Sequence, residues 1–165
     1  SPSRRAVETA EQMERQGLSV KRDSLLSSHV VTQTAGLTES ELCEKFPESS
    51  RYLKEYRHGL RSSSTIPFVR DSLDALRERA REALLSYDEV MFVAHRSFLT
   101  ACLMEAAAAS GAIERTHYGF VPLDYLRLSL IQKGQGGQMN IGFVNQPAAL
   151  LSRGLGVDGW PEAQG

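Results

Sequence analysis

The chain has 165 residues, the length of a single domain, and its composition of 41% hydrophobic and 24% charged residues is that of a globular protein with one core. This composition excludes disorder as a description of the whole chain. The formal net charge of -1, from 19 basic and 20 acidic residues, excludes a broad positive surface for nucleic acid or an anionic membrane. Any anion site must therefore be local.

Membrane spans and disulfides are not expected. No apolar run reaches the ~18 residues that a membrane span requires, and residues 1–20 lack the pattern of a signal peptide. Cys43 and Cys102 each fall in a helical apolar pattern, which favours two buried thiols in a reducing compartment over a disulfide. We expect an intracellular protein of the cytosol or an organelle matrix, and the sequence leaves that choice open.

The first third of the chain is predicted to hold three helices and one strand. Ser1 is the expected cap and Pro2 the first turn of a helix that runs to about Gly17, and residues 18–26 alternate as a strand does. The capping-box spacing of residues 38–41 predicts a short helix that stops at Pro47, followed by another over residues 49–60. A serine-rich loop then leads to Pro67.

The middle of the chain reads as helix, strand and helix. Pro67 begins a long amphipathic helix whose other face is a solvated charge run. Residues 90–94 have the length and branched apolar content of a buried parallel strand, with His95 at its end, and residues 97–109 are strongly helical. The apolar face of the helix that begins at Pro67 comprises Phe68, Leu73, Leu76, Ala80, Ala83 and Leu84.

A hairpin is predicted to close the domain. Residues 118–122 are extended, and residues 126–132 pair with 139–144 across a glycine-rich turn. Residues 145–165, rich in glycine and proline, form an irregular extension that Trp160 could anchor. The alternation of strands and helices predicts an α/β domain over residues 1–144.

Two segments carry the chemistry. In SPSRRAVETA, residues 1–10, Arg5 stands at a helix N-terminus, where free N–H groups and a guanidinium fork both favour a phosphoryl group, whereas Arg4 reads as an exposed basic residue. In VMFVAHRSFL, residues 90–99, His95 follows an apolar strand, and ligands of open α/β sheets bind beyond such strand ends. Arg5 and His95 are therefore candidate anion-binding residues, and the family resemblance of their two segments implies that they converge on one anion-sized hollow.

The two segments resemble the histidine phosphatase superfamily, the phosphoglycerate-mutase-like fold. The first matches the pattern S-P-x-x-R-A-x-x-T-A at every fixed position, and the second is similar to an apolar strand followed by H-G-x-x-L. The resemblance implies a three-layer α/β/α sandwich with a mostly parallel sheet and a C-terminal hairpin. It implies that Arg5 binds phosphate and that His95 holds the transferred phosphoryl group, with no cofactor and no metal.

The signature R-H-G triplet of the family, which follows its first strand and supplies the nucleophilic histidine, has no counterpart before Ser1. Arg57-His58-Gly59 follows residues with helical spacing, so we interpret this triplet as coincidence. The first strand is thus expected to be absent from this chain, and a gap there would expose unpaired backbone groups. Either an upstream segment or another protein is expected to complete the sheet.

Further positions depart from the family pattern. Ser28 aligns with the acid that protonates the leaving group in many members, and serine cannot act as a general acid near neutral pH; His29 is a possible substitute. Arg96 replaces a small residue, so it either fills the pocket or binds an anion. The loop at residues 62–65 lacks the glycine-glutamate-serine triplet of the mutases.

Two hypotheses follow. The first is a catalytically degenerate member that serves as a structural or protein-interaction subunit. The second is an active phosphomonoesterase that works through a phosphohistidine supplied by an N-terminal segment beyond this sequence. The expected partners are phosphate or a phosphomonoester, and a protein partner or the missing segment that completes the sheet. A serine hydrolase is disfavoured because the chain has no G-x-S-x-G elbow.

Overall fold

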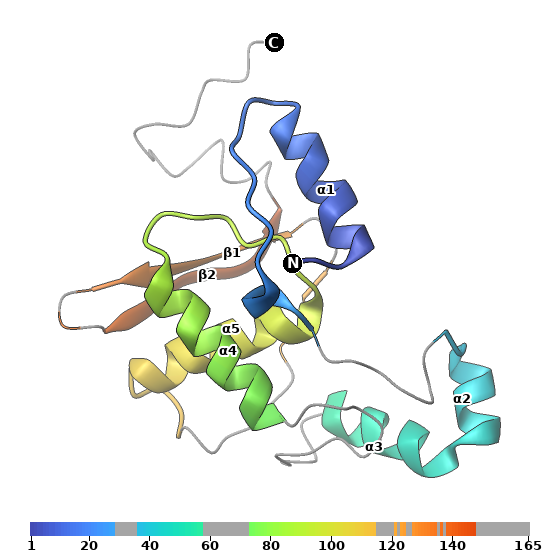
Figure 1. The fold of residues 1–165 in the computed structure, drawn as a ribbon. Coiled ribbons are helices and arrows are strands. Elements are labelled where there is room, and N and C mark those ends of the chain that lie inside the picture. Colours follow the sequence, from blue (N-terminus) through green and yellow to red (C-terminus); the bar gives the residue numbers. More distant parts are fainter. Residues whose placement is uncertain are drawn as a thin grey trace.

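The structure, a computed structural model, describes residues 1–28, 36–57, 73–114, 121, 123, 124, 127–134, 136 and 138–147. Helices and one hairpin make up these residues (Figure 1). In chain order the elements are α1 (Arg4–Glu14), the 3-10 helix η1 (Ser24–Leu26), α2 (Glu39–Lys45), α3 (Pro47–Arg57), α4 (Leu73–Ser86), α5 (Arg96–Ala109), β1 (Arg127–Lys133) and β2 (Met139–Pro147).

The first predicted helix is confirmed as α1, but its cap and the segment after it differ from expectation. Ser3, not Ser1, is the N-cap, and its side chain makes no capping hydrogen bond. The strand predicted over residues 18–26 is wrong, because the chain is extended without a ladder and then turns into η1. The cause is local: the carboxylate of Asp23 accepts a hydrogen bond of 2.8 Å from the N–H of Leu25 and so starts the turn.

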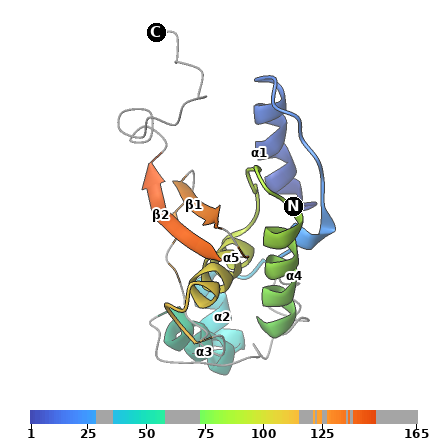
Figure 2. The ribbon, with the colours of Figure 1, turned by 90° about the vertical axis from the view of Figure 1, so that its left-hand side faces the viewer.

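The capping box and the paired helices after it are confirmed. The hydroxyl of Thr38 accepts from the N–H of Glu41, and the Glu41 carboxylate accepts from the N–H of Thr38 at 2.9 Å. Helices α2 and α3 lie at the opposite end of the molecule from α1 (Figures 1 and 2). Helix α2 has no fully buried residue, so the prediction that Cys43 is buried is wrong and its free thiol is exposed.

Helices α4 and α5 pack together and hold most of the core. Every predicted apolar residue of α4 that lies among the described residues is buried, and Phe68 lies outside them. Cys102 is a buried free thiol, and burial raises its pKa, with the nearby charge of Glu105 acting in the same direction. The core cluster comprises Leu26, Leu76, Ala80, Ala83, Leu84, Phe98, Ala101, Cys102, Ala106 and Met139.

Part of the charge run on α4 is not solvated as expected. Arg77 has a side chain only 5% exposed, and its Nε donates to the carboxylate of Glu105, which is 6% exposed, on α5. A buried charge needs a partner of opposite sign, and α5 brings one. Arg79 of the same charge run is half-buried, so it too is not fully solvated.

The buried parallel strand predicted at residues 90–94 is not formed among the described residues. The segment has no regular secondary structure and belongs to no ladder, and Val90 and Met91 are 53% and 45% exposed. A strand requires a neighbouring strand, and the described residues supply none here. The backbone nitrogen of Ser1 donates to the carbonyl of Val93 at 2.9 Å. This contact places the start of the chain beside the entry to α5 (Figure 1).

The predicted hairpin is confirmed. Strands β1 and β2 pair antiparallel, with Lys133 opposite Met139 next to the turn and Arg127 opposite Pro147 at the far end. The register is irregular near Leu130, and Asn145, with φ of 58°, adopts the left-handed conformation that asparagine tolerates. Strand β2 thus includes three residues that the sequence assigned to the extension, and Trp160 lies outside the described residues.

The described residues form an α/β arrangement in which the hairpin packs against α5 and α4 covers α5 from another side (Figure 2). Their sheet has two antiparallel strands, and no parallel pair occurs among them. In the same part of the chain, no helix is long and apolar enough to cross a membrane.

Candidate functional site

The site is built on the first turn of α5. His95 is the N-cap, with an extended backbone at φ -78° and ψ 156°, and its side chain makes no capping hydrogen bond. The first helical bond runs from the N–H of Leu99 to the carbonyl of His95 at 3.1 Å. The N–H groups before it lack a partner within the helix, and the helix dipole adds a partial positive charge at this end. The turn can therefore accept an anion.

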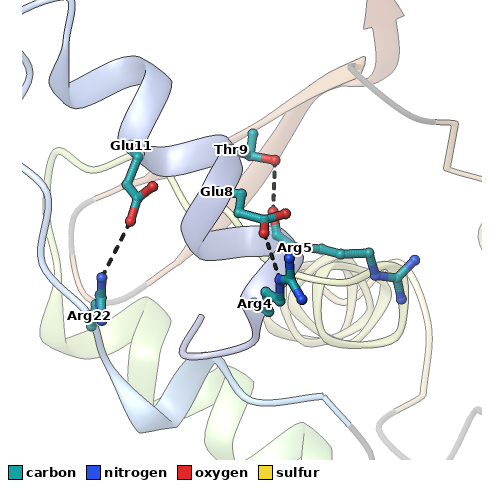
Figure 3. Close-up of polar contacts among 6 residues, drawn as sticks. All are labelled: Arg4, Arg5, Glu8, Thr9, Glu11 and Arg22. Atoms are coloured by element: carbon teal, nitrogen blue, oxygen red, sulfur yellow. Dashed lines mark hydrogen bonds and ion pairs between the residues drawn. The ribbon is translucent and has the colours of Figure 1, made fainter.

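The two arginines at the start of α1 differ in their contacts (Figure 3). Nε of Arg4 donates to the Glu8 carboxylate at 2.7 Å, one turn further along the helix, and its side chain is 90% exposed. The guanidinium of Arg5 points away from this pair, and no hydrogen bond or ion pair engages it within the described part of the chain. The role of Arg5 in binding a phosphoryl group stays a prediction.

Arg5 and His95 lie close enough to interact. His95 is half-buried, and burial lowers the pKa of its imidazole below the usual 6.5, with the positive charge of Arg5 lowering it further. The hydrogen bond from Ser1 to Val93 ties the two segments together, each a few residues from its motif residue. The two segments that carry the family pattern thus meet in space although 90 positions separate Arg5 from His95.

The other expected pocket residues divide into three cases. Ser28 lies at the site, because its hydroxyl is hydrogen-bonded to the hydroxyl of Ser97 in the first turn of α5. Arg96 is the first residue of α5 and is exposed. His29 lies outside the described residues.

Two contacts near Ser28 were missed by sequence reasoning. Ser97 follows His95 by two positions, so its place in the first helical turn could have suggested it. Arg79 of α4 gave no sequence signal, yet its Nη2 donates to the carbonyl of Ser27 at 3.4 Å. Together these contacts hold the end of the residues 18–28 segment between α4 and α5.

The R-H-G triplet at residues 57–59 does not follow a strand. Arg57 is the last residue of α3, as the helical spacing predicted, and His58 and Gly59 lie outside the described residues. No group of three or more histidine, cysteine, aspartate or glutamate side chains in the described ranges is placed to hold a metal ion.

Comparison with known proteins gives one match. The model of the histidine phosphatase superfamily (branch 1) matches residues 1–138, which include both segments described above. No curated protein and no solved structure matches the chain significantly.

Proposed function

Because the chain belongs to the histidine phosphatase superfamily, we propose that it binds phosphate or a phosphomonoester at the first turn of α5 through Arg5 and His95. We further propose that it does so as a catalytically degenerate member that serves as a structural or protein-interaction subunit. The observation that carries the binding proposal is that the segments of Arg5 and His95 lie side by side, joined by the hydrogen bond of 2.9 Å from the nitrogen of Ser1 to the carbonyl of Val93.

The chemistry of the bound state follows from these groups. A lowered pKa keeps the His95 imidazole neutral near pH 7, so it can donate one N–H without adding a second positive charge beside Arg5. Arg5 supplies two parallel N–H donors that match two phosphoryl oxygens. The N–H groups of the helix turn offer further donors.

The degenerate character is supported by Ser28. The family resemblance aligns this residue with the acid that protonates the leaving oxygen, and a hydroxyl cannot replace a carboxylic acid near neutral pH. The Ser28 hydroxyl is already hydrogen-bonded to Ser97, which gives it a role in holding the segment. Arg96, in place of a small residue, adds bulk beside His95.

An active phosphomonoesterase is the second candidate, and the retained pair of Arg5 and His95 favours it. This candidate requires a nucleophilic histidine from a segment that precedes Ser1. His95 would then hold the transferred phosphoryl group and Arg5 would offset the charge that develops on it.

We also propose the three-layer sandwich with a mostly parallel sheet for the complete fold. Residues 90–93 support this, because their apolar sequence lacks a ladder among the described residues and exposes Val90 and Met91. An N-terminal segment or a protein partner would supply the strand that pairs there.

Binding and turnover separate the two candidates. Calorimetric titration of the full-length protein with vanadate, and an assay with p-nitrophenyl phosphate, are compared for wild type, Arg5→Ala, His95→Ala and the control Arg4→Ala. The degenerate candidate predicts vanadate binding that Arg5→Ala and His95→Ala weaken and Arg4→Ala leaves unchanged, with turnover equal to buffer. Turnover that His95→Ala abolishes would establish the enzyme, and no vanadate binding by wild type would overturn both candidates.

A further inference from the structure

The geometry points to Ser97 as a further phosphoryl-binding residue of this site, with Ser28 as the residue that orients its hydroxyl. The inference rests on the proposed phosphate-binding function and adds a donor that the sequence motifs did not indicate. We propose that the Ser97 hydroxyl donates a hydrogen bond to an oxygen of the bound oxyanion.

The position of Ser97 supports this assignment. It is the second residue of α5, two positions after His95, and it is half-buried. Side chains of a helix tilt toward its N-terminus, so the hydroxyl of Ser97 projects toward the turn where the backbone N–H groups end. A ligand held by Arg5 and His95 at that turn lies within reach of this hydroxyl.

The count of hydroxyl protons supports it as well. The contact between Ser28 and Ser97 uses one proton, because a hydroxyl pair shares a single donor. The pair therefore keeps one further proton, and no third group among the described residues accepts it. When Ser28 donates to Ser97, the Ser97 proton is the one that remains, and the hydrogen bond it receives polarises it toward a stronger donor.

Contacts with α4 hold Ser28 in the position from which it orients the Ser97 hydroxyl. Arg79 of α4 donates to the carbonyl of the preceding residue, Ser27, at 3.4 Å. Leu26, one residue earlier, is 6% exposed and belongs to the core cluster with Leu76 and Ala80 of α4. The Ser28 hydroxyl thus approaches Ser97 from a segment fixed to α4, which limits the directions open to the Ser97 proton.

The chemical class of ligand follows from the donors. Arg5, the Ser97 hydroxyl and the N–H groups of the turn, which have no partner within the helix, all donate, so they suit an oxyanion with several unprotonated oxygens. A phosphoryl dianion, or vanadate as its analogue, presents three such oxygens around one centre. A carboxylate presents two in a plane and would leave part of this set without an acceptor.

The test measures vanadate binding to the full-length protein by calorimetry for Ser97→Ala, Ser97→Thr, Ser28→Ala and the control Ser24→Ala. Ser24 is exposed on η1, and its hydroxyl belongs to no part of the site. Ser97→Ala is expected to raise the dissociation constant by about tenfold, since a hydrogen bond to a charged group has at least that effect. Ser97→Thr restores the hydroxyl and should bind within about twofold of wild type.

Ser28→Ala is expected to weaken binding by less than Ser97→Ala, because it removes the orientation of the donor and not the donor. Circular dichroism and the thermal midpoint check that each variant folds, and Ser97→Cys replaces any Ser97→Ala that does not. Tight binding by Ser97→Ala together with weak binding by Arg5→Ala would overturn the role of Ser97 and leave the proposed function standing. A wild type that does not bind vanadate would overturn the proposed function and this inference with it.

Discussion

Two adjacent arginines at the start of α1 show how a single position decides a role. Arg4 faces Glu8 one turn along the helix, and this exposed pair neutralises its charge at little gain in stability. Arg5 is rotated by about 100° from Arg4 on the helix, and its guanidinium points away from that pair (Figure 3). Its charge acts on His95, which burial has already made harder to protonate. The pKa of His95 should therefore respond to the charge of Arg5 and not to the charge of Arg4.

We predict that Arg5→Met raises the pKa of His95 toward its ordinary value, because it removes a nearby positive charge. The control Arg4→Met should leave the pKa unchanged, since Arg4 is paired with Glu8. Proton NMR of the imidazole during a pH titration measures both values. Equal pKa values in wild type and Arg5→Met would contradict the closeness of Arg5 and His95.

The sign of the linked stability follows from the same shift. A histidine whose pKa is lower in the folded state stabilises the fold above its unfolded value of about 6.5, and this contribution is lost as pH falls through the folded pKa. Wild type should therefore lose more stability than Arg5→Met when the pH falls below 6.5. Urea unfolding at several pH values measures this.

At the scale of elements, the helices and the hairpin could be predicted because their signals are local. The capping box of Thr38 and Glu41 lies within four residues, and the turn at Gly134 joins strands that are adjacent in sequence. The strand over residues 90–94 could not be settled this way, since an apolar extended segment becomes a strand only beside another strand. The partner of a parallel strand lies far away in the sequence, so the local pattern does not show whether it is present.

The pair of Arg77 and Glu105 shows the same limit between α4 and α5. Taken alone, Arg77 is predicted to be a surface charge and Glu105 an interruption of an apolar run. The two residues are 28 positions apart in the sequence, so no local pattern predicts their contact. Both side chains are nearly excluded from water. A buried ion pair has to be judged as a unit, because removal of one partner leaves the other charge uncompensated.

We predict that Glu105→Gln lowers the free energy of unfolding by about 3–5 kcal/mol, since it leaves the buried guanidinium without its counter-charge. The double variant Arg77→Met with Glu105→Leu should recover much of that loss, because it replaces the pair by apolar groups of similar size. The exposed ion pair of Arg51 and Glu48 is a matched control, and Glu48→Gln should change stability by less than about 1 kcal/mol. Urea unfolding measures all of them. A double variant no more stable than Glu105→Gln would contradict this account.

At the scale of the whole molecule, one core joins η1, α4, α5 and β2, and so holds the segments of Ser28 and Ser97 together. Leu26, Leu76, Phe98 and Met139 come from η1, α4, α5 and β2 and lie in one cluster. The sequence predicted that Arg5 and His95 would meet, because each lies in a motif whose place in the family is known. It could not predict the contacts of Ser97 with Ser28 and of Arg79 with Ser27, since these depend on how the segment that ends at Ser28 packs between α4 and α5.

Phe98 connects this core to the site. It is fully buried and directly follows Ser97, and its ring meets Phe92 edge to face with centroids 6.3 Å apart. Phe92 in turn meets Tyr87 at 5.9 Å, and the Tyr87 hydroxyl donates to Asp23, which lowers the pKa of that carboxyl. A row of aromatic rings thus runs from the end of α4 to the first turn of α5.

We predict that Phe98→Ala lowers the free energy of unfolding by about 3–5 kcal/mol, through lost apolar burial and the cavity that remains. Leu85→Ala is the control, because Leu85 is 50% exposed and its truncation should change stability by less than about 0.5 kcal/mol. Urea unfolding of the full-length protein, followed by near-ultraviolet circular dichroism of the aromatic side chains and by far-ultraviolet circular dichroism of the helices, measures both changes. If the core is one cooperative unit, the two probes report the same midpoint in Phe98→Ala as they do in wild type. Midpoints that separate in the variant would show that the packing of the aromatic rings is lost before the helices unfold, so that the site rests on a smaller unit than the cluster indicates.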